Sequence, residues 1–381
     1  MSDLNLSELD YDLPQERIAQ WPLEERDASR MLLLDRRSGA WADRQFRDFP
    51  EMLRGDELIV INNARVLPAR LWGHRKGLRA QPVGKNSPIL QEHLSAAVEV
   101  LLLRACGADE WEALVRPGRK ISVGETIVFG DGELQAEVVT RYGFGLRRLK
   151  FASTGNFTEE VERLGHIPLP PYIKRDDSPL DRERYQTVFA RSGTAVAAPT
   201  AGLHFTPEIL ARVRERGAEV VELTLDVGLG TFEPVRTERL EDHHIHTESY
   251  EIPASTAETI TRAHVEHRPL LAVGTTVVRA LEDAAEKFAA RHGTKHGERV
   301  DVDANKNAAI PDGRAEADIF LFPGKPFRVV DQLITNFHLP RSSLLALVAG
   351  FAGRESVLRA YRHAVEAEYR FYSYGDCMWI R

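Results

Sequence analysis

Residues 62–150 differ from the rest of the chain in the spacing of their apolar residues. Short segments of alternating apolar and polar residues are separated by Gly- and Pro-containing turns. Such strands, with no helical period between them, are typical of a small antiparallel β-barrel. The predicted strands lie at residues 69–73, 97–103, 111–115, 126–129 and 135–139. Residues 76–94 carry Gly, Pro, Asn and Ser without a clear period and are predicted to form a loop.

On both sides of this stretch, buried-strand patterns alternate with helical periods. Strands are predicted at residues 31–35, 57–61, 220–227, 270–273, 318–321 and 328–330, and helices at 13–19, 207–216, 255–266, 277–290 and 344–352. This alternation predicts a mixed-sheet α/β fold with helices on the faces of the sheet. We therefore expect an α/β catalytic domain formed by residues 1–61 and 151–381, interrupted by a basic β-barrel domain at 62–150. The polar residues 292–315 are predicted to be a long surface loop.

The composition is that of an ordinary globular protein, with 43% hydrophobic and 28% charged residues. Cys106 and Cys377 form no metal-ligand spacing and suit a reducing compartment. No apolar run approaches the ~20 residues that cross a bilayer, and no export signal is visible. A cytoplasmic monomer without a membrane partner is expected.

The net charge of −7 is unevenly distributed. Residues 62–150 contain 14 Lys and Arg against 9 Asp and Glu, which gives this stretch a charge of +5. A basic module within an acidic body could attract phosphates. A solvated charged face is the alternative interpretation.

Residues 195–205 are small and unhindered apart from one imidazole, that of His204, just before a helix start at Thr206 and Pro207. Small residues at a helix start let a ligand approach backbone N–H groups, and His adds acid–base capacity near neutral pH. A tightly packed turn with a structural histidine is the alternative.

Three further turns carry polar groups of the same kind. Residues 225–231 follow a strand and are punctuated by Gly228 and Gly230, as in a ligand loop or a simple tight turn. Residues 274–279 place Gly, two Thr and Arg279 at a helix start, which suits a carboxylate or phosphate, or ordinary capping. Residues 335–343 place Asn336 and His338 before another helix.

Residues 241–248 contain three His and three carboxylates. Such groups could bind a metal, but the chain has no matching second cluster. A role in acid–base chemistry or in ligand binding is therefore favoured over metal binding. An exposed polar turn remains the alternative. The aromatic residues 369–376 could stack on a base or form a core strand edge.

These stretches, together with residues 62–70, 165–173 and 184–188, resemble the S-adenosylmethionine:tRNA ribosyltransferase-isomerase family of queuosine biosynthesis over nearly the whole chain. The chain departs from the usual pattern at Asp226, where His is usual, and at Ser343, where Thr is common. Residues 76–94 and 292–315 also look longer than usual.

The resemblance implies transfer and isomerisation of the ribosyl group of S-adenosylmethionine. The acceptor is 7-aminomethyl-7-deazaguanine (preQ1) at the tRNA wobble position, and the products are epoxyqueuosine-tRNA, adenine and methionine. S-adenosylmethionine is then a co-substrate, and neither a permanently bound cofactor nor a metal is expected.

Under this resemblance, candidate residues fall into three groups. Candidates for proton transfer are His204, Asp242, His243, His246 and His338. Candidates for substrate binding are Thr200, Gly202, Gly228, Gly230, Thr231, Thr275, Thr276, Arg279 and Asn336. Candidates for tRNA contact are Arg65, Arg70, Arg116, Arg119, Arg147 and Arg148.

Two other function classes are distinguishable from this one. A tRNA-binding module without chemistry would need only the barrel and would leave the polar turns unexplained. An ordinary methyltransferase would account for residues 225–231 and would release S-adenosylhomocysteine instead of adenine and methionine.

Overall fold

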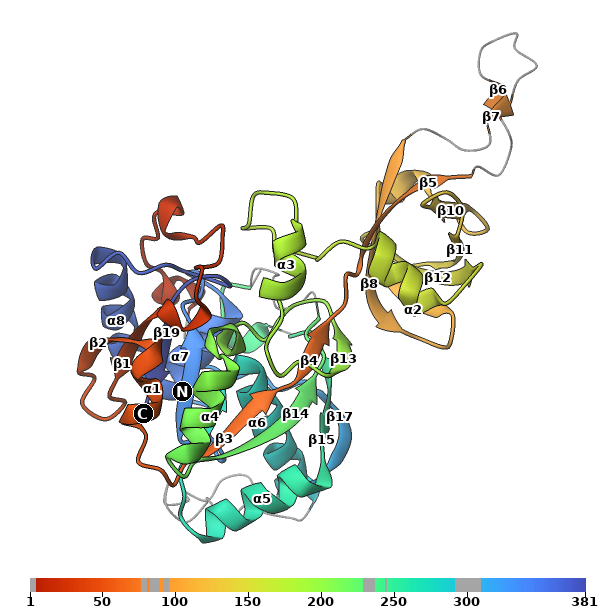
Figure 1. Ribbon diagram of the computed structural model, residues 1–381. Helices are drawn as coiled ribbons and strands as arrows, with labels where there is room; N and C mark the ends of the chain where they lie inside the picture. The colour runs from red at the N-terminus through yellow and green to blue at the C-terminus, as the bar shows by residue number, and fades with distance from the viewer. Residues whose placement is uncertain are drawn as a thin grey trace.

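The computed structural model describes residues 5–76, 81–82, 90–91, 96–228, 237–243, 245–291 and 310–381. Two parts are plain in Figure 1: a large α/β body that carries both chain termini, and a β-barrel beside it. The barrel strands come from the middle of the chain and the body from both ends, so the barrel is an insertion in the body.

Within the described residues, nine strands form the mixed sheet of the body. In spatial order they are β17 (Gly313–Ala317), β15 (Glu248–Ile252), β14 (Glu219–Leu225), β3 (Leu58–Asn62), β16 (Leu270–Val273), β18 (Gln332–Asn336), β19 (Cys377–Ile380), β1 (Arg30–Leu34) and β2 (Trp41–Gln45). The central strands β14, β3, β16 and β18 run parallel, while β15, β17, β19 and β2 pair antiparallel with a neighbour. The predicted mixed-sheet class is confirmed.

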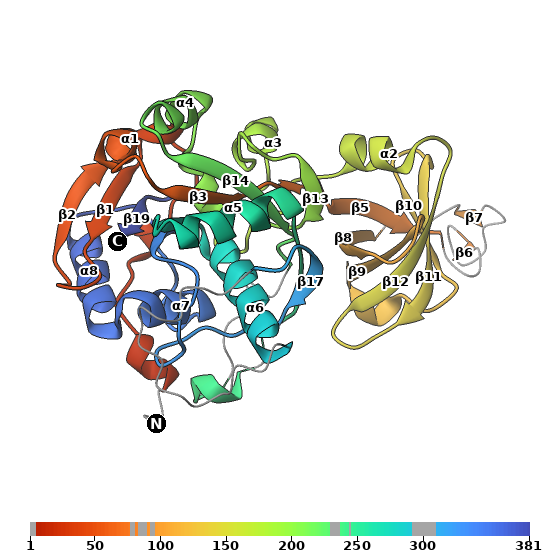
Figure 2. The ribbon, with the colours of Figure 1, turned by 90° about the horizontal axis from the view of Figure 1, so that it is seen from below.

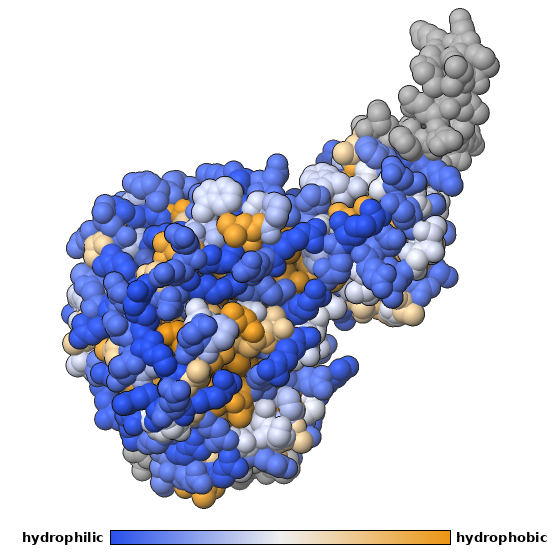
Figure 3. Space-filling view, viewed as in Figure 1, coloured by the Kyte–Doolittle hydropathy of each residue, from blue (hydrophilic) through white to orange (hydrophobic). Residues whose placement is uncertain are grey.

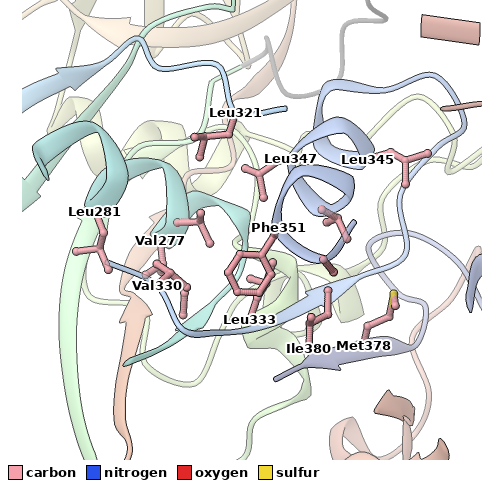
Figure 4. Close-up of a cluster of buried hydrophobic side chains, with 14 of the residues drawn as sticks. Val277, Leu281, Leu321, Val330, Leu333, Leu345, Leu347, Phe351, Met378 and Ile380 are labelled. Atoms are coloured by element: carbon pink, nitrogen blue, oxygen red, sulfur yellow. The ribbon is translucent and has the colours of Figure 1, made fainter. Parts of the chain in front are cut away.

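Helices cover both faces of this sheet (Figure 2). One face packs against α5 (Ala254–Val265), α6 (Thr275–Arg291), α7 (Ser343–Ala352) and α8 (Arg354–Glu366). The other packs against α1 (Phe49–Met52), α4 (Pro207–Glu215) and the 3-10 turn η6 (Thr200–His204). Successive residues of a strand point to opposite faces, so the fully buried β3 contributes to both cores. Leu58 and Val60 pack in the first core, and Ile59 and Ile61 pack in the second. Figure 4 shows the first core, where Val277 and Leu281 of α6 meet Phe351 of α7.

The inserted barrel is closed and antiparallel. Its strands, in order around the barrel, are β10 (Thr126–Phe129), β11 (Leu134–Arg141), β12 (Leu146–Ser153), β9 (Glu110–Arg116), β8 (Ala97–Ala105) and β5 (Arg70–Arg75). Alternate residues point inward and form a separate apolar core. Helix α2 (Phe157–Leu164) packs on this core, and α3 (Pro179–Arg184) follows it in the chain. Two short two-stranded sheets lie outside the barrel: β4 (Ala64–Val66) pairs with β13 (Ser192–Ala195), and β6 (Gln81–Pro82) pairs with β7 (Leu90–Gln91).

Several predicted elements differ from the structure. Residues 13–19 form a 3-10 turn, Gln15–Arg17, instead of a helix, and residues 318–321 and 328–330 are not strands. The backbone N–H groups of residues 328–330 donate to the carboxylate of Glu282 on α6, so they are not available to a sheet ladder. Residues 313–315, the end of the predicted loop 292–315, belong to the edge strand β17. The rest of the predicted loop 292–315 up to residue 309, and most of 76–94, lie outside the described residues.

Candidate active site

A cavity of about 300 Å³ lies at the carboxyl ends of parallel strands β14, β16 and β18. Ligands of open α/β sheets bind at this edge. Three turns line the cavity: residues 197–201, 274–276 and 335–342. Val227, Tyr172, Tyr372 and Ser373 also line it. Figure 3 shows that the surface of the body is mostly hydrophilic on the face seen in Figure 1, with hydrophobic residues gathered in a few areas.

The turn between β16 and α6 supplies two hydroxyl groups. Gly274 adopts a left-handed φ of +97°, and its N–H donates to the carbonyl of Ile334 on β18. Thr275 and Thr276 then begin α6, and both are buried. The Thr276 Oγ1 lies 3.4 Å from the Nδ2 of Asn62, at the end of β3. Hydroxyl groups and a helix start together suit an anionic or polar part of a ligand.

His204 lies at the end of η6 and is held from both sides. Its Nδ1 lies 2.8 Å from the Oγ of Ser29, and its Nε2 lies 3.1 Å from the Oδ1 of Asn336. The Asn336 Nδ2 donates to the carbonyl of Tyr372, which directs Oδ1 toward the imidazole and selects the Nε2–H tautomer of His204. Burial lowers the pKa of His204 to about 4, so the imidazole is neutral at pH 7. His204 does not line the cavity itself and contacts it through Asn336.

His338 lines the cavity directly. Its Nε2 lies 2.8 Å from the Oγ1 of Thr335, and its carbonyl accepts a hydrogen bond from the Tyr11 hydroxyl at 2.5 Å. Its backbone N–H donates to the hydroxyl oxygen of Tyr361. Burial lowers the pKa of His338 to about 3, which makes it a second neutral imidazole. A neutral imidazole is the form that accepts a proton.

Aromatic residues form one wall of the cavity. The rings of Tyr172 and Tyr372 lie with their centroids 4.2 Å apart. Tyr372 has a left-handed φ of +72°, an uncommon backbone state for a bulky residue, and its N–H and carbonyl both bond to the 335–338 turn. The Tyr172 hydroxyl lies 2.6 Å from the Oγ of Ser373. Local strain of this kind gathers at functional sites.

The structure brings some of the predicted residues together at this cavity and places others elsewhere. Thr200, Thr275, Thr276, Asn336 and His338 line it. Gly202 does not line it: an added Cβ there would lie 2.6 Å from the Phe189 ring, so this glycine permits close packing. Gly228 donates its N–H to the Glu248 carboxylate, and Gly230 and Thr231 lie outside the described residues.

The histidine-rich turn lies apart from the cavity lining. Asp242 and His246 are exposed, and the His243 ring lies 5.1 Å from that of Phe320. Arg279 is buried and forms an ion pair with the buried Glu248, so its charge is used within the fold. In the described residues, no group of three or more His, Cys, Asp or Glu side chains is placed to bind a metal ion.

The six arginines predicted to contact tRNA have different environments, and Arg65 lies on β4, outside the closed barrel. Arg116 and Arg119 are exposed, and the Arg116 guanidinium lies 4.0 Å from the Glu99 carboxylate. Arg65, Arg70 and Arg148 lie within 4 Å of Glu162, Glu99 and Glu112, respectively. Arg147 is 1% exposed and donates to the carbonyls of Gly118 and Leu146. An inward guanidinium that bonds to backbone carbonyls supports the barrel and does not present its charge to a partner.

The sequence interpretation missed several residues of the cavity. Thr335 lies in the polar turn 335–343 but is not among the candidates, Tyr172 lies in a stretch that carries only the family resemblance, and Tyr372 and Ser373 lie in the stretch 369–376, interpreted as stacking or as a core strand. Asn62, which does not line the cavity but contacts Thr276 beside it, is also absent from the candidates. The signal that could have found Asn62 is its position directly after the buried strand β3, at the same sheet edge as the other turns.

The fold is a mixed-sheet α/β body with an inserted barrel. The cavity at the carboxyl edge of its sheet combines imidazole, hydroxyl and aromatic side chains, as in the active site of an α/β enzyme. The family model described as "Queuosine biosynthesis protein" matches residues 6–380. The S-adenosylmethionine:tRNA ribosyltransferase-isomerase of Solibacter usitatus is 54% identical over 99% of this chain and 100% of its own length. The proteins of that name from Moorella thermoacetica and Desulfitobacterium hafniense are 46% and 42% identical, with the same coverage.

The crystal structure of the S-adenosylmethionine tRNA ribosyltransferase from Thermotoga maritima is similar to this chain, with a TM-score of 0.50 and 32% identity. The match covers 98% of this chain and 100% of that one. The chain therefore belongs to the S-adenosylmethionine:tRNA ribosyltransferase-isomerase family of queuosine biosynthesis. It is an enzyme of the transferase and isomerase class that takes part in tRNA modification. None of its described helices is both long and apolar enough to cross a membrane.

Proposed function

We propose that this enzyme transfers and isomerises the ribosyl group of S-adenosylmethionine onto preQ1 at the wobble position of tRNA. The products are epoxyqueuosine-tRNA, adenine, methionine and a proton. The single observation that carries the proposal is the position of the His338 imidazole in the wall of the cavity, where Thr335 holds it, with the His204 imidazole attached to the same wall through Asn336.

The chemistry needs a base that is unprotonated at neutral pH. The sulfonium of S-adenosylmethionine acidifies the adjacent C5′ hydrogens, and a base that removes one of them starts the loss of adenine and the rearrangement of the sugar. The acceptor amine of preQ1 must be neutral to attack, which requires a second proton acceptor. We assign removal of the C5′ proton to His338, because its imidazole lines the cavity. We assign to His204 the role of orienting the Asn336 side chain.

The remaining cavity residues suit the two substrates. Thr275 and Thr276 at the start of α6 would hold the methionine carboxylate or a sugar hydroxyl. The Tyr172 and Tyr372 rings would stack on a base. On the barrel, the exposed Arg116 and Arg119 are the arginines best placed to contact the tRNA backbone.

Product analysis tests this proposal. The protein is incubated with S-adenosylmethionine and a tRNA that carries preQ1, and the small molecules and digested nucleosides are identified by mass spectrometry. Adenine and methionine in step with epoxyqueuosine are expected. S-adenosylhomocysteine with a methylated nucleoside would instead establish a methyltransferase.

A further inference from the structure

A second, larger cavity, of about 790 Å³, lies at the opposite edge of the sheet from the active site. It is lined by Pro269, just before β16, by Gln332 at the start of β18, and by Arg381, just after the antiparallel β19. Figures 1 and 2 both place the C-terminus at the side of the body away from the barrel. The cavity is therefore separate from the active site and from the proposed tRNA-binding face.

Unpaired arginine side chains gather in this cavity from three distant parts of the chain. They are Arg36, Arg37, Arg328 and Arg381. Across the described ranges, none of their guanidinium groups lies within 4 Å of a carboxylate or donates a hydrogen bond to the protein. Arg36 stacks on the Phe351 ring at 4.2 Å, and Arg381 lies 5.3 Å from the centre of the Trp379 ring. Ring contacts fix the guanidinium planes and leave their N–H donors available.

The two carboxylates of the cavity are already committed to the backbone. Asp35 accepts hydrogen bonds from the N–H groups of Arg37 and Ser38, and Asp331 accepts one from Leu270 at 2.9 Å. Arg54 and Arg268 also line the cavity, and they pair with Asp56 and Glu219 outside it. Asp331 and Glu282 still attract Arg36 through space, and Asp35 attracts Arg381. The four unpaired arginines nevertheless outnumber the two carboxylates that line the cavity, so the cavity keeps an excess of positive charge.

This arrangement contrasts with the barrel, where arginines face glutamates. Arg70 lies 3.2 Å from Glu99 and Arg104 lies 3.1 Å from Glu112. Like charges that share one concave surface repel one another, and the repulsion is relieved when an anion binds among them. Guanidinium groups match the oxygens of phosphate through paired N–H donors.

We propose that this cavity is a binding site for a multiply charged phosphate ligand. Its volume is within the range of about 300–1,000 Å³ of small-molecule sites, so it accommodates a nucleotide or a short polyphosphate. The phosphate groups could belong to a free anion or to a nucleic-acid backbone. The two sources share the same chemistry and are separated by experiment.

The test uses inorganic tripolyphosphate as the probe, with isothermal titration calorimetry on the full chain. Arg36→Gln/Arg328→Gln removes two charges from the cavity. The matched control, Arg212→Gln/Arg314→Gln, removes two charges from exposed ion pairs of the body, outside this cavity. We expect saturable binding by the unmodified protein, a loss of about tenfold or more in the cavity variant, and less than about a twofold change in the control. Arg37→Glu, at an exposed side chain, tests the same site without touching the Phe351 contact.

A parallel titration with tRNA at several salt concentrations separates the two sources. A loss of tripolyphosphate binding alone in the cavity variants identifies a free phosphate ligand. A loss of tRNA affinity with a shallower salt dependence, absent from the control, identifies a nucleic-acid backbone. Equal behaviour of the cavity variants and the control toward both probes would overturn the proposal.

Discussion

The side-chain oxygen of Asn336 lies 3.1 Å from the Nε2 of His204, although the two residues are 132 positions apart in the sequence. Asn336 ends β18 and lines the cavity, while its amide nitrogen bonds to the carbonyl of Tyr372. One side chain thus connects an imidazole, a strained tyrosine and the cavity wall.

We predict that Asn336→Ala lowers the rate of S-adenosylmethionine consumption by about a hundredfold or more. The change frees the cavity wall that Asn336 holds, and a displacement of about 1 Å in an active site lowers the rate by about that factor. The same change leaves the buried Tyr372 carbonyl without this donor and costs about 1–3 kcal/mol of unfolding free energy. Steady-state kinetics and urea unfolding measure the two effects. The control is Asn156→Ala, which removes the cap of α2 and should cost about 1 kcal/mol without changing the rate.

The pKa of His338 predicts a stability that falls with acid. The imidazole is neutral in the fold down to about pH 3, whereas in the unfolded chain it takes up a proton below its ordinary pKa of 6.5. The unfolded state therefore binds more protons between these values, and His338 removes about 1 kcal/mol of stability per pH unit as the pH falls from 6.5. Glu282 has the opposite effect on stability between pH 4.5 and about pH 7. Burial raises its pKa to about 7, so the folded state binds more protons than the unfolded state in this range.

The contribution of His338 is isolated by comparing the wild type with His338→Gln. The variant should show a weaker dependence of the unfolding free energy on pH between 4 and 6.5, measured by chemical denaturation. Identical slopes would mean that His338 titrates normally in the folded protein.

We predict that Arg116→Gln/Arg119→Gln weakens tRNA binding and that Arg147→Met destabilises the barrel instead. The first pair is exposed, and each lost phosphate contact should reduce the salt slope of tRNA binding by about 0.9. Arg147 is buried, and its loss leaves carbonyls such as that of Gly118 without this donor, at a cost of about 1–3 kcal/mol. Filter binding and thermal unfolding distinguish the two. An Arg147→Met protein that folds normally but loses tRNA affinity would contradict the assignment.

Breaking the buried Arg279–Glu248 pair should affect folding first. Arg279→Met leaves the Glu248 carboxylate buried without its cation, which costs about 3–5 kcal/mol. Replacing both residues, as Arg279→Met/Glu248→Gln, should recover part of that loss. Calorimetry of the single and double variants measures the recovery, and an unchanged melting temperature in the single variant would show that the pair does not stabilise the fold.

Much of the fold is predictable from the sequence because its strands and helices keep simple periods. The buried strands β3 and β16 and the helices α4, α5 and α6 lie within a few residues of their predicted positions. Strand β12 was missed because Arg147 occupies an inward position of the barrel, where the alternating pattern calls for an apolar residue. Residues 328–330 have the composition of a strand, but the Glu282 carboxylate takes their N–H groups.

The site is only partly predictable, since the sequence shows its polar turns but does not show which of their side chains come together in the fold. Thr275 and His338 follow strands and Asn336 ends one, so these three residues could be placed at one sheet edge. The sequence pattern does not reveal that Arg279, one turn into α6, points to Glu248 on β15 instead of to the cavity. Nor does it reveal the wall formed by Tyr172 and Tyr372, which depends on the left-handed backbone at Tyr372.

The most direct measurement of the central claim is quantitative product analysis of the wild type beside His338→Gln and Asn336→Ala, each with S-adenosylmethionine and preQ1-bearing tRNA. The wild type should release adenine and methionine in equal amounts with epoxyqueuosine, and both variants should release about a hundredth of this or less while still binding tRNA. S-adenosylhomocysteine as the product, or full release of adenine by both variants, would contradict ribosyl transfer in this cavity.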